Sequence, residues 1–158
     1  MQFKWYRGKK RISSLKQRNK KGAVVVKIEA IYKGSLTTSL THLPSGANIQ
    51  TSAPLDNGGT GMSFSPTDLL AASLLSCILT TMAIKAEKLG LKFGTASGSV
   101  EKHMIADPLR RVGQLVVAIK MPSDLSLEHF KVLEEAGRIC PVAKSLADHL
   151  DAQIEFLT

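Results

Sequence analysis

The sequence holds two cysteines, Cys77 and Cys140, and these are the side chains best suited to chemistry. Cys77 lies in an apolar run with helical patterning (residues 65–90), where a free cysteine usually packs as a small hydrophobic side chain. Cys140 directly precedes Pro141, so we expect it at or beside the N-cap of a helix over residues 141–149. Free backbone N–H groups and the helix dipole at such a position favour the nucleophilic thiolate. The two residues are 63 positions apart, and this spacing alone does not show whether the thiols meet.

Other catalytic and metal-binding patterns are missing from the sequence. Arg138 stands two residues before Cys140, where it would favour the thiolate if it folds toward the sulfur. A zinc site needs ligands at short spacings, but the sequence has neither a CxxC nor an HxxxH pattern. It also lacks a GxSxG nucleophile elbow and a phosphate-binding glycine loop. We therefore expect no metal and no cofactor, although four histidines remain as alternative partners of the thiols: His42, His103, His129 and His149.

The net charge of +8 is concentrated in residues 1–22, which hold nine Lys or Arg and no acidic residue. Residues 23–158 carry the other 12 basic and all 13 acidic residues, so this part of the chain is nearly neutral. We interpret residues 1–22 as a basic extension and residues 23–158 as one domain. Three interpretations of the extension stay open: an anchor for polyanions, a solvated tail without a role, or an artefact of start-site choice. Because the domain is neutral, we expect no nucleic-acid partner.

Hydropathy and cysteine content indicate the cellular compartment in which we expect the protein. No run of 18 uncharged apolar residues exists, and the basic start lacks the apolar stretch of a secretory signal. Two cysteines far apart in sequence do not form the disulfide framework of a secreted domain. We therefore expect a cytoplasmic protein with no membrane partner.

The central run has clear helix signals at both ends. Ser65 is a good N-cap and Pro66 a good first residue, and Asp68 completes an Asp-for-Glu capping box. Gly90 ends the helix after about 24 residues. The first half is apolar on nearly all sides, so we expect it to be buried by a sheet and by another subunit. Steps of three and four predict one helical face: Leu70, Leu74, Cys77, Thr81 and Ile84.

The flanking segments alternate or carry turn residues, and they predict strands before and after this helix. The order βββ-α-ββ-α-α-β indicates an α+β fold with antiparallel sheets around a long buried central helix. The predicted segments are strands over 23–32, 36–43, 48–54, 91–106, 110–121 and 152–158, and helices over 66–89, 123–139 and 141–149.

The paired motifs SPTDLLAASLLSC (65–77) and CPVAKSL (140–146) are similar to those of the OsmC/Ohr family of osmotically inducible and organic-hydroperoxide-resistance proteins. The resemblance covers about residues 26–158 and includes the element order, so the chain resembles a divergent OsmC-like branch. It implies an intertwined homodimer with a site at each end of the subunit interface.

The resemblance also implies a two-cysteine peroxidase of the oxidative-stress defence. Cys77 matches the residue that attacks an organic hydroperoxide and becomes sulfenic acid, and Cys140 matches the residue that resolves it as a disulfide. An external dithiol would reduce this disulfide. The alternative is a non-catalytic OsmC-like protein that binds small molecules or senses redox state.

Two positions depart from the peroxidase pattern. Thr67 stands where the peroxidases have Glu, and the nearest acid is Asp68. Residues 22–109 hold no Arg to supply the activating cation, and Lys27 or Lys33 substitutes only if correctly placed. A buried thiol without a cation nearby has a raised pKa, so the open question is what activates Cys77.

Overall fold

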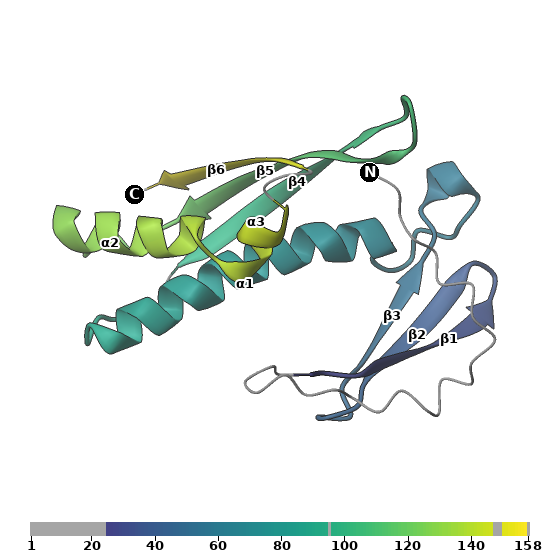
Figure 1. The fold of residues 1–158 in the computed structure, drawn as a ribbon, viewed down its shortest axis with the longest axis horizontal. Helices are drawn as coiled ribbons and strands as arrows, with labels where there is room; N and C mark the ends of the chain where they lie inside the picture. The colour runs from purple at the N-terminus through teal and green to yellow at the C-terminus, as the bar shows by residue number, and fades with distance from the viewer. Residues whose placement is uncertain (1–24, 95, 147–149, 158) are drawn as a thin grey trace.

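A computed structural model describes residues 25–94, 96–146 and 150–157. The strands and helices follow one another along the chain in the predicted order βββ-α-ββ-α-α-β, and the strands form two three-stranded sheets (Figure 1). This arrangement confirms the predicted α+β fold class. The basic extension over residues 1–22 lies outside the described residues. The elements are β1 (Ile28–Gly34), β2 (Thr37–His42), β3 (Asn48–Ser52), α1 (Pro66–Lys88), β4 (Ser97–Ile105), β5 (Arg111–Lys120), α2 (Leu127–Arg138), α3 (Pro141–Leu146) and β6 (Asp151–Leu157).

The start of α1 confirms the predicted capping box. The Ser65 hydroxyl accepts a hydrogen bond from the Asp68 backbone N–H, and the Asp68 carboxylate accepts one from the Ser65 backbone N–H at 2.7 Å. Pro66 takes the first helical position, where its missing N–H costs nothing. Lys85 and Lys88 lie in the last turn, where cations favour the negative end of the helix dipole.

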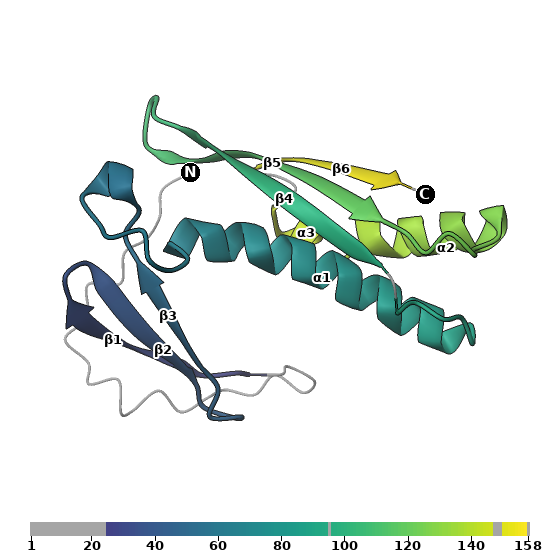
Figure 2. The same ribbon diagram turned by 180° about the vertical axis from the view of Figure 1, so that it is seen from behind.

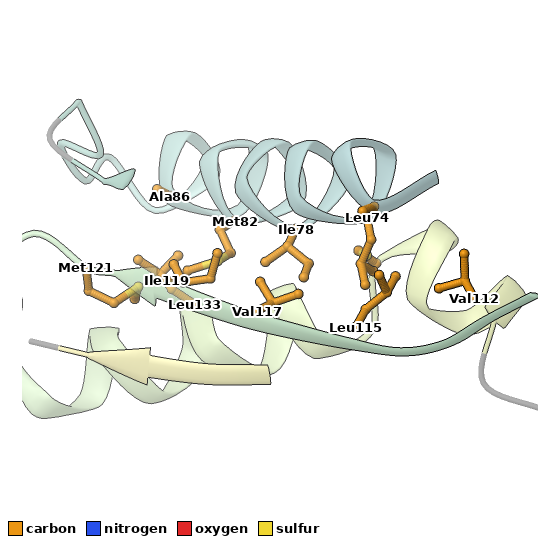
Figure 3. Close-up of a cluster of buried hydrophobic side chains, with 12 residues drawn as sticks. Leu74, Ile78, Met82, Ala86, Val112, Leu115, Val117, Ile119, Met121 and Leu133 are labelled. Carbon is orange, nitrogen blue, oxygen red and sulfur yellow. The ribbon is translucent and has the colours of Figure 1, made fainter. Parts of the chain in front are cut away.

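The core of the domain lies between α1 and the second sheet (Figure 3). Its buried helix face differs from the predicted one: Leu74 belongs to it, but Ile84 is 50% exposed and Cys77 only flanks the core. Apolar residues surround most of α1, so their spacing does not single out the face that meets the sheet. The buried residues of α1 are Ala71, Leu74, Ile78, Met82 and Ala86, and β5 supplies Val112, Leu115, Val117 and Ile119.

The second sheet has the strand order β4-β5-β6 and is mixed. β4 and β5 are antiparallel, as are both strand pairs of the first sheet. β6 runs parallel to β5. The prediction of antiparallel sheets is therefore wrong for this strand pair. The reason is the crossover through α2 and α3, which returns the chain to the same end of the sheet. Both helices pack on the same side of the sheet as α1 (Figures 1 and 2).

The first sheet, β1-β2-β3, stands away from the second sheet and its helices (Figures 1 and 2). Strand register places Ile28, Tyr32, Leu40 and Ile49 on one face of this sheet. Three of them are more than half exposed: Ile28 at 59%, Tyr32 at 63% and Ile49 at 51%. An apolar sheet face of this kind has no core of its own within the described chain.

Helix α1 is long and apolar enough to cross a membrane by length and composition alone. One face of it forms the core with β5, however, and the core helix of a soluble domain passes the same test.

Candidate active site

The two cysteines come together between α1 and α3. Cys140 belongs to the core and has no exposed surface, while Cys77 is partly buried and packs against the same core. The two thiols are close enough to interact, and neither is in a disulfide. Chain folding therefore joins two residues that the sequence separates by 63 positions.

Cys140 occupies the predicted place directly before α3, which begins at Pro141. Its Sγ accepts a hydrogen bond from the Ala143 backbone N–H at 3.4 Å. Burial nevertheless raises the pKa of the Cys140 thiol, and the neighbouring Cys77 raises it further, so the favourable Ala143 contact is outweighed. Cys140 is therefore a protonated, buried thiol, and the more accessible Cys77 is the better placed of the two to meet a substrate. The described part of α3 ends at Leu146, and the rest of the predicted 141–149 helix, with His149, lies outside the described residues.

Arg138 does not fold toward the Cys140 sulfur. Its guanidinium binds Glu134 one helical turn earlier, with Nη2 to Oε1 at 2.8 Å, and lies 5.0 Å from the centre of the Phe156 ring. The Arg138 charge is therefore paired with Glu134 on α2 and packs against the Phe156 ring on β6. The condition under which this arginine would favour the Cys140 thiolate is therefore not met.

A polar cluster at the start of α1 brings in a residue that the sequence did not indicate. Lys102 on β4 donates hydrogen bonds to Asp68 Oδ1 at 2.5 Å and to Thr67 Oγ1 at 3.0 Å. Thr67 is also hydrogen-bonded to the Ser65 hydroxyl at 3.0 Å. Both Thr67 and Asp68 thus have contacts beyond the helix cap, and Lys102 supplies the cation at this end of α1.

Competing effects set the charge state of Asp68. Its partial burial raises the pKa, but the hydrogen bonds from Lys102 and Ser65 together outweigh burial and hold the pKa below its usual value. Asp68 is therefore ionised at neutral pH and forms an ion pair with Lys102, whose side chain is only 19% exposed.

An open cavity of about 730 Å³ lies beside this ion pair. Asp68 and Lys102 line it together with mostly apolar residues from the loop before α1, from α1 and from β4: Gly61, Met62, Ser63, Phe64, Ala71, Ala72 and Val100. Cys77 is not among the lining residues. The volume falls within the range of roughly 300–1,000 Å³ that is usual for small-molecule sites.

The other cationic side chains that were candidates from the sequence lie outside the cluster of Lys102, Asp68 and Thr67. Lys27 pairs with Glu29 at the exposed start of the first sheet, and Lys33 is exposed on β1. Arg110 binds Asp56 at 2.9 Å on the surface. Within the described ranges, no group of three or more His, Cys, Asp or Glu residues is arranged to hold a metal ion.

Lys102 could not be found from the sequence because its partners lie about 35 residues earlier. It occupies an alternating strand, where a lysine normally faces solvent. Only the packing of β4 on α1 brings its amino group to the helix start.

The geometry can be compared with known proteins. Residues 59–155 match the family model of the OsmC-like proteins. A crystal structure from Psychrobacter arcticus, of a protein assigned to the osmotic stress and detoxification response, is 40% identical in sequence. It superposes with a TM-score of 0.76 over 85% of this chain and 96% of its own. The chain belongs to the OsmC-like family.

More distant OsmC-like structures share the fold. An organic hydroperoxide resistance protein from Legionella pneumophila is 16% identical with a TM-score of 0.70, over 87% of this chain and all of its own. The organic hydroperoxide resistance protein OhrB of Bacillus subtilis is 18% identical with a TM-score of 0.61, over 84% and 98% of the two chains. At these identities the likeness extends to the fold alone. No curated protein matches the sequence.

Proposed function

We propose that this OsmC-like protein is a thiol peroxidase that reduces organic hydroperoxides through a cycle of Cys77 and Cys140. The observation that carries the proposal is the contact between these two thiols at the edge of the core. The names of the related hydroperoxide resistance proteins favour the same activity.

In the first step the Cys77 thiolate attacks the terminal oxygen of the hydroperoxide. An S–O bond forms, the O–O bond breaks, and the alkoxide leaves with the electron pair and takes a proton to become an alcohol. Cys77 is oxidised to sulfenic acid. Its partial exposure on α1 supports this role, whereas Cys140 has no exposed surface with which to meet a substrate.

In the second step the Cys140 thiol condenses with the sulfenic acid. The S–S bond forms, the S–O bond breaks, and the hydroxyl group leaves as water with the Cys140 proton. The raised pKa of Cys140 keeps that proton on the sulfur until this step. An external dithiol then reduces the disulfide and is itself oxidised, which suits a reducing compartment such as the cytoplasm.

The proposal includes a homodimer. The apolar face of the first sheet, with Ile28, Tyr32 and Ile49, has no cover within the described chain. A shallow groove between α1 and the segment before β4, lined in part by Leu79, Ala83 and Phe93, is also largely apolar. A second copy would cover both surfaces and remove them from water.

Turnover measurements test the proposal. We expect the full chain to consume cumene hydroperoxide with dithiothreitol as reductant, and Cys77→Ser to abolish consumption. Cys140→Ser should give at most one fast turnover, because its sulfenic acid has no internal partner. Ser76→Ala is the matched control, since Ser76 is exposed on the adjacent position of α1. Turnover by the wild-type chain no faster than by Cys77→Ser would refute the proposal and leave a binding or redox-sensing role.

A further inference from the structure

The first sheet and the segment that follows it form one unit, here called the arm (residues 25–64). β1, β2 and β3 pair with one another, and the chain after β3 folds back onto them. The Ala53 N–H donates a hydrogen bond to the Leu36 carbonyl at 2.9 Å, and the Phe64 carbonyl accepts one from the end of β3 at 3.1 Å. The loop between these contacts is closely packed, because a Cβ added to Gly59 would lie 1.9 Å from the Ala53 oxygen. These contacts bind the arm together as far as Phe64.

The body of the domain begins at the next residue. Ser65 caps α1 through its side chain and is 2% exposed, so the helix fixes its position. The second sheet and its three helices pack on one another, whereas in the described part of the chain the strands of the arm pack extensively only on each other. Figures 1 and 2 show the same separation from both sides. The peptide link between Phe64 and Ser65 therefore joins two units that are each held together internally.

One ion pair bridges the arm and the body. Arg110, in the hairpin between β4 and β5, donates through Nη2 to Asp56 Oδ2 at 2.9 Å. Asp56 belongs to a short 3₁₀ helix of the arm, Leu55–Asn57. Among the described residues, no other hydrogen bond or ion pair joins residues 25–64 to residues 65–157. The two side chains are 46% and 63% exposed, so salt screens the attraction between them.

We propose that the arm is a hinged lever with its pivot at the Phe64–Ser65 link, and that the Arg110–Asp56 ion pair is the lock that holds it to the body. With the lock closed, the arm presents its apolar face in one fixed direction. With the lock open, the arm turns about the pivot while its strands keep their own hydrogen bonds. An exposed ion pair shifts such an equilibrium by about two- to five-fold, so the lock is reversible.

The lock acts within one chain and does not depend on the proposed peroxidase activity. Both thiols belong to the body, and neither is part of the ion pair. A second copy that binds the apolar face of the arm would be oriented by the lock, but the lock itself is measurable without such a copy. Failure of the lever and failure of the thiol chemistry are therefore separate results.

The test is a pulsed electron–electron distance measurement between two spin labels in the full chain. Gln50→Cys on the arm and Glu135→Cys on α2 are exposed label sites, and the native cysteines are replaced by Cys77→Ser and Cys140→Ala. Labelled chains are diluted in excess unlabelled chain, so that the distance within one chain is measured. We expect one main distance, from the locked arm.

Variants of the ion pair should open the lock. Asp56→Asn keeps the size of the side chain but removes its charge, and it should lower the ratio of locked to unlocked arms about two- to five-fold. Arg110→Gln should do the same, and the exchange of charges in Asp56→Arg with Arg110→Asp should restore the main distance. Sodium chloride at about 1 M, where the Debye length is about 3 Å, should lower the ratio in the wild type and leave Asp56→Asn unchanged.

Glu29→Gln is the matched control, because it removes an ion pair of similar exposure that lies wholly within the arm, between Lys27 and Glu29. It should leave the distance distribution unchanged. A distribution in Asp56→Asn equal to that of the wild type would show that other contacts hold the arm, and it would overturn the proposal. An equal effect of Glu29→Gln would overturn it as well.

Residual dipolar couplings of the ¹⁵N-labelled chain give a second measurement that keeps both native cysteines, should the labelled variant fail to fold. A single alignment tensor should fit arm and body in the wild type. Two different tensors should be needed in Asp56→Asn, because the open arm reorients relative to the body. A single tensor for both units in this variant would contradict the lever.

Discussion

Replacing Lys102 by Met should destabilise the protein at neutral pH and much less in acid. The substitution removes two hydrogen bonds, to Asp68 and Thr67, and leaves the Asp68 carboxylate without its cation. Hydrogen bonds to charged groups contribute about 1.5–3 kcal/mol, whereas exposed ion pairs contribute about 0–1 kcal/mol. The Asp68 side chain is 38% exposed, which moves the expected loss toward the lower values, to about 1 kcal/mol.

The pH dependence follows from the lowered pKa of Asp68. A carboxyl group whose pKa is lower in the folded state stabilises the fold fully above its ordinary pKa of 3.8. This contribution is lost as the pH falls through the lower folded pKa. In Lys102→Met the hydrogen bonds from Ser65 remain, but the part of this stabilisation that Lys102 supplies is already absent at neutral pH. The difference between wild type and variant should therefore shrink as the pH falls to about 3.

Urea unfolding at pH 7 and at about pH 3 measures the difference in free energy of unfolding between wild type and variant at each pH. All titrations use one fixed protein concentration, because the stability of a dimer depends on concentration. Lys120→Met is the matched control, since Lys120 is exposed at the end of the neighbouring strand β5. We expect the control to differ from wild type by less than about 0.5 kcal/mol at both pH values. An equal loss for Lys102→Met at both pH values, or a loss no greater than that of the control, would refute this reasoning.

Three further predictions concern single positions. Leu36 has a φ of 57° in the turn between β1 and β2, so Leu36→Gly should raise the free energy of unfolding by about 0.5–1 kcal/mol in urea titrations. Gly137→Ala should lower it by about 1 kcal/mol, because the added Cβ would lie 2.9 Å from Met82 Sδ and 3.0 Å from the Phe156 ring. Iodoacetamide should label Cys77 before the fully buried Cys140, as peptide mass spectrometry would show, and equal labelling rates in the folded protein would contradict the placement of Cys140.

Local signals allowed much of the fold to be predicted. The capping box of α1 was correct because Ser65, Pro66 and Asp68 act on backbone groups within one turn. The element order was also correct, since hydrophobic period and turn residues are properties of short segments. The buried face of α1 was only partly predicted, because Leu70 and Ile84 are as apolar as the residues that enter the core.

Contacts between segments far apart in the chain could not be predicted from the sequence. Lys102 reaches Asp68 only because β4 packs on α1, and no pattern in an alternating strand distinguishes it from a solvated lysine. Proximity in sequence left open whether Arg138 folds toward Cys140, and the structure shows its side chain bound to Glu134 and packed against Phe156 instead. The parallel pairing of β6 likewise depends on the path of two helices rather than on the strand's own residues.

The pairing of Cys77 with Cys140 is tested most directly by intact mass and thiol titration after one equivalent of cumene hydroperoxide is added to the reduced protein. We predict the loss of two hydrogen atoms from the mass, the loss of both free thiols, and one cross-linked peptide pair that contains Cys77 and Cys140. Cys140→Ser should instead gain one oxygen atom, and Cys77→Ser should not change. Full retention of both thiols in the wild-type protein, or a disulfide between two chains in place of the one within a chain, would contradict the account.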